Sequence, residues 1–293
     1  MDLVKYEQAV LHTRGVNHRE GSFRYKDLGQ GTPGRPDNFY LRMVWTQGDF
    51  FSPRHMHNFD QVRVQIKGRF SFDKDGTMHP GCLGYFPEGT PYGPQTSAED
   101  TIQLAMQIGG PSRSGYLSEE ERSAAVDALS KRGRFERGRY FAPDDKTGAG
   151  QDGFEAAWEF ANGRRIKYPK RRLEKPLLVN PEAFEWLDLP GFAGARTKRL
   201  WDFGSRALAC SLYHISAGSW LVLTGAQTVF VQSGSGGIGQ LRFTQFDALH
   251  LAAGESARIE AQEDTELLAM SHPVLPHVAA RSATAAQSAV ESS

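Results

Sequence analysis

The sequence predicts an all-β protein in which two small barrels of the jelly-roll kind are joined by a partly helical connector. Short strand-like segments separated by Gly and Pro turns occupy residues 38–109, and a second series with similar spacing occupies residues 206–270. A stretch with helical patterning lies between the two series. Two similar series within 293 residues are most economically explained by an internal duplication.

The first series contains a strand with two different faces. Within residues 60–72, Val62, Val64 and Ile66 alternate with the polar residues at 61, 63 and 65, which is the period-2 pattern of a strand. Turns are expected at residues 73–76 and 91–94, where Gly and Pro accumulate. The polar residues of the strand are therefore expected to share one face.

The connector begins with a predicted helix over residues 117–132. Ser118 and Glu121 have the spacing of a capping box, and Gly133 follows the helix. A short second helix is expected at residues 154–161. The Arg and Lys residues within 134–175 form either a rim that faces substrate or a solvated linker.

These patterns divide the chain into four parts. We expect an N-terminal barrel with a candidate metal site over residues 1–115 and a connector over 116–200. A second barrel is expected over 201–278, and a disordered tail over 279–293.

Composition excludes several classes of function. The chain has 34 basic and 34 acidic residues, so it lacks the positive field of a general nucleic-acid binder. It shows no apolar run of membrane-spanning length and no signal peptide, and its two cysteines, Cys82 and Cys210, are far apart. We therefore expect a cytoplasmic protein that binds neither nucleic acid nor membrane.

A pair of histidines is the main candidate for chemistry. His55 and His57 are separated by one residue at the start of a predicted strand, so both side chains are expected on one side of the sheet, and Gln61 has the same parity. Two imidazoles and a third donor make half of a coordination sphere for a divalent ion. Asp60 would offer a carboxylate instead if the register shifted, although its parity directs it to the opposite face.

The text around these histidines resembles the cupin superfamily. Its first motif, G(X)5HXH(X)3,4E(X)6G, is matched with one extra residue and with Gln61 in place of Glu. Its second motif, G(X)5PXG(X)2H(X)3N, is matched with Tyr92 in place of His. The matched positions are Gly48, His55, His57, Gln61, Gly68, Gly81, Pro87, Gly89 and Tyr92.

The second half of the sequence resembles a degenerate copy of the same motif. Phe246, Ala252 and Gly254 occupy its Gly, Pro and Gly positions, and Ala257 stands where the His belongs. No histidine stands near residues 223–226, where a first motif would place its pair. The resemblance is thus to a bicupin with one candidate site, and His214, His250, His272 and His277 are expected to be packing or surface residues.

The resemblance implies a metal-dependent enzyme that acts on a small organic molecule, with a dioxygenase or other oxygenase as the leading hypothesis. It implies His55, His57, Gln61 and Tyr92 as metal ligands, with Gln61 and Tyr92 also in catalytic roles. The implied cofactor is a divalent metal, Fe(II) first and Mn(II), Ni(II) or Zn(II) as alternatives. A redox-neutral isomerase, lyase or hydrolase and a non-catalytic ligand-binding bicupin remain open.

Further polar residues are candidates for substrate binding. Arg63 has the parity of the histidines, so it is either a clamp for a substrate carboxylate or phenolate or a partner in an internal salt bridge. Gln103 and Gln107 alternate with apolar residues on the last strand of the first series and are expected in the same cavity. Pairing through sheet edges makes a homodimer a further hypothesis.

Overall fold

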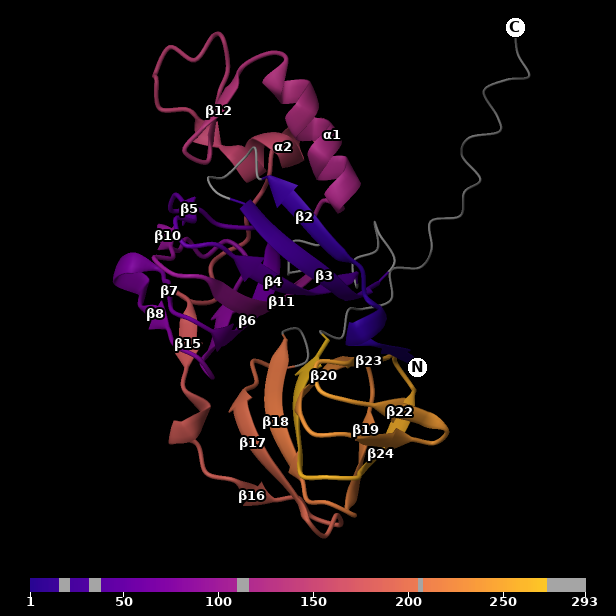
Figure 1. Ribbon diagram of the computed structural model, residues 1–293. Helices are drawn as coiled ribbons and strands as arrows, with labels where there is room; N and C mark the ends of the chain where they lie inside the picture. The colour runs from indigo at the N-terminus through magenta and orange to yellow at the C-terminus, as the bar shows by residue number, and fades with distance from the viewer. Residues whose placement is uncertain (16–21, 32–37, 110–115, 205–207, 273–293) are drawn as a thin grey trace, which may run out of the picture.

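The computed structural model describes residues 1–15, 22–31, 38–109, 116–204 and 208–272 (Figure 1). The strands of the first half form one β-structure, the strands of the second half form another below it, and two helices lie at the far end of the first. The predicted all-β class with two barrels and a partly helical connector is confirmed. The predicted tail over 279–293 lies outside the described residues.

The N-terminal barrel contains, among the described residues, a seven-stranded sheet and a four-stranded sheet. The order of the larger sheet is β15 (Leu177–Val179), β9 (Leu83–Phe86), β6 (Phe59–Lys67), β11 (Thr101–Gly109), β4 (Phe39–Thr46), β3 (Ser22–Gln30) and β2 (Leu11–Gly15). The order of the smaller sheet is β5 (Phe51–Ser52), β10 (Gln95–Thr96), β7 (Phe70–Ser71) and β8 (Thr77–Met78).

The C-terminal barrel repeats this arrangement within the described part of the chain. Its larger sheet has the order β1 (Asp2–Val4), β23 (Ala248–Leu251), β20 (Gln227–Ser233), β25 (Thr265–Ser271), β18 (Ala209–Ile215), β17 (Ala195–Trp201) and β16 (Leu187–Asp188). Its smaller sheet has the order β19 (Trp220–Thr224), β24 (Ser256–Ala261), β21 (Gly236–Ile238) and β22 (Leu241–Phe243). When the two strand orders are matched, β6 corresponds to β20, and β9 corresponds to β23.

Each barrel takes its outermost strand from a segment far from the rest of its sheet. β1, at the N-terminus, pairs with β23 of the C-terminal barrel, and β15 pairs with β9 of the N-terminal barrel. β15, β16 and all but the last residue of β17 lie within 116–200, the range predicted as connector, and the pairing shows them to be sheet strands. Short strands without a turn motif on both sides gave no sequence signal.

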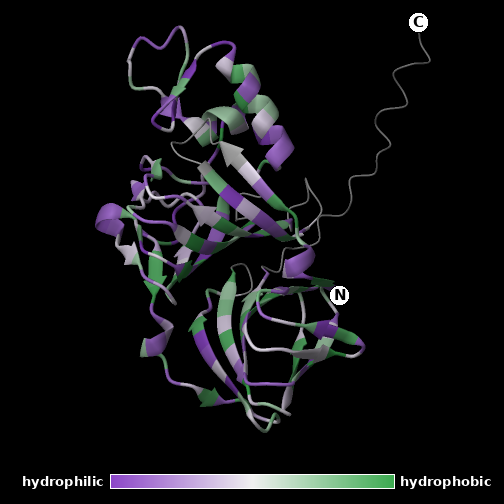
Figure 2. Ribbon diagram, viewed as in Figure 1, coloured by the Kyte–Doolittle hydropathy of each residue, from purple (hydrophilic) through white to green (hydrophobic). Residues whose placement is uncertain are grey.

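The two larger sheets pack against each other through apolar residues. Val62 and Leu104 of the N-terminal barrel belong to one buried cluster with Leu212 and Leu268 of the C-terminal barrel. Figure 2 shows hydrophobic residues along the strands that face this junction. The alternation of β6 thus sends one face into the shared core and leaves the other face, with Gln61, Arg63 and Gln65, for the interior of the N-terminal barrel.

One close backbone approach fixes the junction. Gly29 has φ +148°, and a Cβ at this position would lie 1.9 Å from His250 Nε2, so only glycine fits. His250 Nε2 donates to the Leu28 carbonyl oxygen over 2.8 Å, and His250 Nδ1 lies 3.1 Å from Thr228 Oγ1. His250 is therefore a packing residue between the barrels, as its sequence context predicts.

The connector forms a layer over one end of the N-terminal barrel. It contains the helices α1 (Glu119–Ser130) and α2 (Gly153–Asn162) and the strands β12 (Arg134–Glu136), β13 (Arg139–Phe141) and β14 (Gln151–Asp152). The predicted capping box of α1 is present, with Ser118 Oγ accepting from the Glu121 backbone N–H. Neither helix of the described chain has the length and apolar character needed to cross a bilayer.

Candidate functional site

The two predicted histidines lie in the loop before β6 rather than within a strand. His55 and Tyr92 exchange both backbone hydrogen bonds, with N···O distances of 3.1 and 2.9 Å, so the loop is anchored to the segment that follows β9. The ring centroids of His55 and His57 are 4.8 Å apart. The predicted proximity of the two imidazoles is therefore present, on an extended loop rather than on a strand.

Arg63 lies at the centre of the polar residues inside the barrel. Its Nε donates to Gln61 Oε1 over 2.7 Å, its Nη1 donates to Gln95 Oε1 over 2.7 Å, and its Nη2 lies 3.4 Å from the Tyr92 hydroxyl. The residue is only 8% exposed. The guanidinium thus connects Gln61 and Tyr92, two of the predicted metal ligands, and Gln95, which the sequence analysis missed.

Burial dominates the electrostatics of this arginine. Desolvation lowers the pKa of Arg63, and the neighbouring Tyr92 partly offsets that effect. The guanidinium also lies 5.0 Å from the Phe86 ring centroid and 5.5 Å from that of Phe72, within the range of cation–π attraction. Because an arginine keeps its proton in proteins, the barrel interior holds a permanent positive charge.

His55 is fixed at both ring nitrogens. Its Nδ1 donates to the Pro53 carbonyl oxygen over 2.6 Å, which leaves Nε2 as the acceptor. The Gln95 amide nitrogen lies 3.1 Å from that Nε2 and donates to it. A chain of hydrogen bonds therefore runs from Arg63 through Gln95 to His55.

His57 connects the polar cluster to the open side of the barrel. Its Nδ1 lies 2.9 Å from the Tyr92 hydroxyl, and its ring stacks on Phe59 at 4.5 Å and 12°. Phe154, from α2, contacts the same imidazole edge-on at 5.1 Å. A second chain of contacts thus runs from Arg63 through Tyr92 to His57.

The remaining predicted residues divide into two groups. Gln103 lies in the interior, where its Nε2 donates to Gln65 Oε1 over 2.6 Å. Gln107 lies at the end of the barrel and lines a cavity together with His57. Asp60 is on the other face of β6, as its parity predicts, and accepts from the Tyr85 hydroxyl and from Arg172.

A cavity of about 660 Å³ opens between the end of the N-terminal barrel and the connector. The barrel side contributes His57, Phe59 and Gln107, and the connector contributes Phe154 and the first turn of α1. Figure 2 shows hydrophilic residues at the end of α1 nearest β3, where that turn lies. The cavity has the size and the mixed lining of a small-molecule site.

A buried arginine holds the first turn of α1 over this cavity. Arg42, on β4, lies 3.7 and 4.0 Å from the ring centroids of Tyr25 and Tyr40 and pairs with Asp27 at 3.0 Å. Its Nη1 lies 3.4 Å from Glu119 Oε2 of α1. Arg42 has carboxylate partners, whereas Arg63 is held by amides and a phenol.

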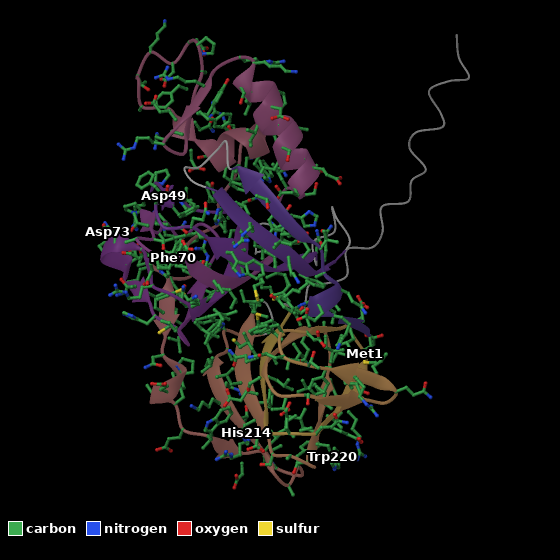
Figure 3. All side chains as sticks on the ribbon, in the orientation of Figure 1. Met1, Asp49, Phe70, Asp73, His214 and Trp220 are labelled. Carbon is green, nitrogen blue, oxygen red and sulfur yellow. The ribbon has the colours of Figure 1, made fainter. Side chains whose placement is uncertain are left out.

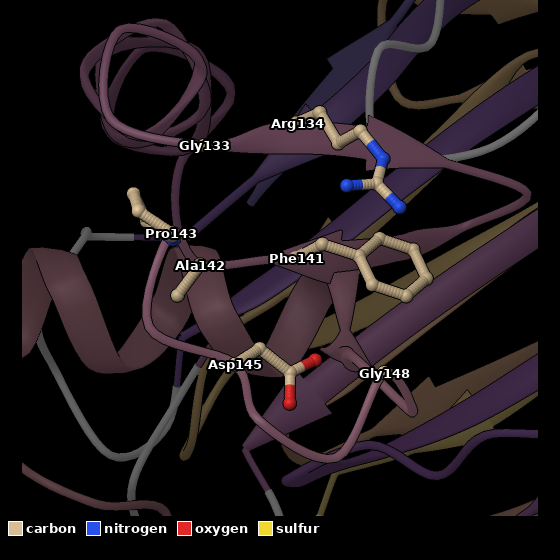
Figure 4. Close-up of a pocket in the computed structure, with 7 residues that line it drawn as sticks. All are labelled: Gly133, Arg134, Phe141, Ala142, Pro143, Asp145 and Gly148. Carbon is tan, nitrogen blue, oxygen red and sulfur yellow. The ribbon is translucent and has the colours of Figure 1, made fainter.

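A second, smaller cavity lies apart from the barrel interior. It measures about 330 Å³ and is lined by residues 133–134, 141–143, 145 and 148 of the connector (Figure 4). Asp145 forms one wall, and its carboxylate accepts from the backbone N–H groups of Thr147 and Gly150. These bonds shape the loop itself, so the carboxylate serves local structure.

The predicted metal ligands already contact other polar groups. Gln61 Oε1 accepts from Arg63, Tyr92 contacts both Arg63 and His57, and His55 Nε2 accepts from Gln95. The described residues contain no group of three or more His, Cys, Asp or Glu side chains arranged to hold a metal ion. Gln61 Oε1 and His55 Nε2, two of the atoms that a metal would need, thus already accept hydrogen bonds.

Electrostatic repulsion from Arg63 also disfavours a metal ion at this place. A metal bound to Gln61 Oε1 would lie about 2.1 Å from that oxygen and hence within about 5 Å of Arg63 Nε. Repulsion between a divalent ion and a guanidinium at this separation is about 7 kcal/mol for an effective dielectric constant of about 20. With no carboxylate among the donors to offset it, these residues do not fit a divalent metal.

Comparisons with known proteins support the fold. No family model matches the sequence, and no curated protein matches it. Among solved structures, a candidate dioxygenase from Nostoc punctiforme PCC 73102 superposes with a TM-score of 0.63 at 11% identity, covering 94% of this chain and 84% of that one. An oxalate decarboxylase from Bacillus subtilis superposes with a TM-score of 0.54 at 14% identity, covering 92% and 76%.

This chain has the bicupin fold. A further structure of the Bacillus subtilis oxalate decarboxylase, which has Mn(II) centres, superposes with a TM-score of 0.53 at 13% identity, covering 94% of this chain and 78% of that one. The bicupin described here differs in its donor set, since Arg63 occupies the middle of the predicted ligands. Arg42 and Phe154 lie outside the two cupin motifs, and Gln95 stands at a position that the second motif leaves unspecified. The sequence therefore carried no signal for these three residues.

Proposed function

We propose that the N-terminal barrel is the active site of an enzyme that acts on a small organic molecule by redox-neutral proton transfer. This class contains the isomerases, lyases and hydrolases that the sequence leaves open. The C-terminal barrel is proposed to be structural. The observation that carries the proposal is the position of His57, which lines the large cavity and also contacts the Tyr92 hydroxyl.

The contacts define a route for a proton. When the Tyr92 hydroxyl donates a hydrogen bond to His57 Nδ1, the proton of the neutral imidazole is on Nε2. Nε2 is the nitrogen that would meet a substrate. As Nε2 releases its proton to the substrate, Nδ1 takes the proton of Tyr92, and Arg63 stabilises the resulting phenolate. The reverse sequence removes a proton from the substrate, so one relay serves as acid and as base.

The cavity wall beside His57 is aromatic, whereas Asp27, Arg42 and the first turn of α1 make the rest of the lining polar and charged. Phe59 and Phe154 hold the His57 ring from its face and its edge, so the imidazole is fixed in orientation before a substrate arrives. Gln107 supplies an amide for a polar group of the substrate. We propose Arg63 and Gln103 as interior support rather than as direct substrate contacts.

A dioxygenase is the second candidate function. The similarity to the Nostoc protein, which extends over 94% of this chain, favours it. Fe(II) would supply dioxygen activation in such an enzyme, with His55 and His57 as its first ligands. The engaged donors around Arg63 are the reason that this function ranks second.

The two candidates are separated by incubating the purified chain with a panel of small organic acids, ketones and esters in D₂O. Proton NMR follows exchange or conversion, and an oxygen electrode follows dioxygen. We expect deuterium incorporation or conversion of one class without oxygen uptake, and loss of that activity in His57→Gln. Oxygen uptake that requires added Fe(II) would replace the proposal with the dioxygenase.

His250→Gln is the matched control, since this histidine lies between the barrels and contacts no cavity residue of the site. Activity equal to wild type is expected for it. Equal loss in both histidine variants would indicate damage to the fold rather than to the relay.

A further inference from the structure

Arg63 differs from Arg42, Arg54 and Arg172 in what surrounds its charge. Arg42 contacts Asp27 and Glu119, Arg172 contacts Asp60, and Arg54 contacts Asp75. The hydrogen-bond partners recorded for Arg63 are two amides and a phenol. Burying a charge without a carboxylate partner carries a large desolvation cost. The presence of Arg63 here therefore suggests that its charge has a role in the barrel interior.

The surroundings of Arg63 are arranged for a cation at this place. Three aromatic rings, those of Phe72, Phe86 and Tyr92, lie with centroids 5.5, 5.0 and 5.7 Å from its guanidinium carbon. The oxygen atoms of Gln61 and Gln95 both face it at 2.7 Å. Oxygen donors and ring faces together present negative potential to one point in the barrel.

That point lies among the residues that the cupin motifs align with metal ligands. Gln61 stands in the place of the Glu and Tyr92 in the place of the His, and both contact the guanidinium. Each replacement substitutes a neutral group for a better metal ligand. The two changes fit together. A glutamate at position 61 would pair with Arg63 and neutralise its charge, whereas the neutral Gln61 leaves the positive charge in the barrel.

We propose that Arg63 replaces the divalent metal ion as the positive centre of the N-terminal barrel, so that this barrel works without a metal. The positive centre holds Tyr92 in contact with His57 and stabilises the phenolate when the proton passes to the imidazole. Arg63 is a positioning residue, since it acts through Tyr92. This role deepens the proposed function and rests on it, whereas the exclusion of metal rests on charge and donors alone.

The experiment measures metal binding, which a merely structural arginine would not control. Chain freed of metal by a chelator is titrated with Zn(II), Mn(II) and, under anaerobic conditions, Fe(II), by calorimetry and by elemental analysis after gel filtration. Wild type and Arg63→Lys, which keeps the charge, are compared with Arg63→Met and Arg63→Gln, which remove it. The same series is repeated with Gln61→Glu, which restores the missing carboxylate.

We expect no stoichiometric metal in wild type or Arg63→Lys. Affinity is expected to rise roughly 100-fold or more when Arg63→Met is combined with Gln61→Glu, because repulsion is removed and a carboxylate is gained. Arg42→Met is the matched control, since it removes a buried arginine from the same barrel, and no rise is expected. Thermal unfolding of each variant establishes that it is folded, and Arg63→Gln serves if Arg63→Met is not.

Two results would overturn the inference. One equivalent of metal in wild type, lost on replacement of His55 and His57 by Ala, would show that the arginine does not replace the ion. Equal metal affinity in the Lys and Met variants would show that charge is not what excludes it. Neither measurement uses a substrate, so failure here is distinguishable from failure of the proton-transfer proposal.

Discussion

The two barrels have the same order of strands, but the interior of the N-terminal barrel is polar and that of the C-terminal barrel is apolar. β6 contributes Gln61 and Arg63 to the interior of the N-terminal barrel, whereas β20, at the same place in the other sheet, contributes Val229 and Val231. The rest of the second interior is equally apolar, with Leu221, Leu223, Ile238, Phe243, Leu249, Leu251, Ala257, Ile259, Ala261, Leu267 and Ala269 among its residues. One scaffold thus supports either a polar site or a packed core.

The loops differ as much as the interiors. Six residues separate β5 from β6 and carry His55 and His57, while two residues separate β19 from β20. The segment that carries Tyr92, between β9 and β10, has eight residues, and its counterpart between β23 and β24 has four. Side chains that reach a barrel interior from its rim need such loops, so shortening them removes a site without disturbing the sheets.

The C-terminal barrel instead stabilises its neighbour. Its larger sheet covers the apolar face of the N-terminal sheet, and β1 at the start of the chain is one of its strands. Figure 3 shows His214 and Trp220 at the end of this barrel remote from the N-terminal one. One barrel thus provides buried area, and the other has polar residues in its interior.

The largest effect that would sharpen this comparison is expected from Tyr92→Phe. Loss of the hydroxyl interrupts the contact between Arg63 and His57, and kcat/KM is expected to fall by about 10²–10⁴, the range of a lost acid–base contribution. Tyr213→Phe in the C-terminal barrel is the matched control and should retain wild-type activity. Full activity in Tyr92→Phe would remove the relay from the account.

The next effect concerns stability rather than activity. Leu221 is fully buried in the interior of the C-terminal barrel, and Leu221→Ala is expected to lower the free energy of unfolding by about 2–5 kcal/mol. Urea denaturation followed by fluorescence measures this loss. Activity per folded molecule should not change, and a fall in it would show that the second barrel takes part in function.

A smaller effect is expected at the cover of the cavity, which the C-terminal barrel lacks among its described residues. Ser118→Ala removes the cap of α1 and should destabilise that helix by about 1 kcal/mol. Hydrogen exchange at the amides of α1 should accelerate about fivefold, with no change in the strands of either barrel. Unchanged exchange in α1 would show that contacts such as Arg42–Glu119, rather than the cap, hold the cover in place.

We expect the free energy of unfolding to depend modestly on pH because of His250 at the junction between the barrels. Burial is the main cause that lowers the pKa of His250, and its hydrogen bond to the Leu28 carbonyl oxygen partly offsets this. The unfolded chain takes up a proton as the pH falls below about 6.5 while the folded chain does not, so stability is lost on acidification, by at most about 1.4 kcal/mol per pH unit for this group.

Urea denaturation between about pH 7.5 and 5.5 measures this loss, and His250→Gln should reduce the slope. His79→Gln, at an exposed position, is the control and should leave the slope unchanged. A slope that survives in His250→Gln would place the responsible group elsewhere.

Much of the fold could be predicted from sequence because strand periodicity and turn residues are local signals. The strand that carries Gln61 and Arg63 (β6), the last strand of the first series (β11) and both helices lie where the patterns place them. Gly68 shows why the motif glycines are informative, since its φ is +72° and a Cβ there would meet the Asp100 carbonyl oxygen at 2.6 Å. β1 and β15 were missed because their partners are distant in the chain, and β16 because it has only two residues.

The site was predictable in membership but not in organisation. Parity correctly placed Gln61, Arg63 and Gln103 on the interior face of the N-terminal sheet, and spacing brought His55 close to His57. What occupies the centre depends on the reach of one long side chain to Gln95, 32 residues away. No local pattern encodes that contact. The motif typical of metal ligands therefore did not reveal that the guanidinium of Arg63 lies among them.

Anomalous diffraction from crystals grown with Mn(II) or Zn(II) tests the central claim most directly. The account predicts guanidinium density between Gln61, Gln95 and Tyr92 and no anomalous peak beside His55 or His57. An anomalous peak at ligand distance from both imidazoles, with Arg63 turned away from the interior, would contradict it.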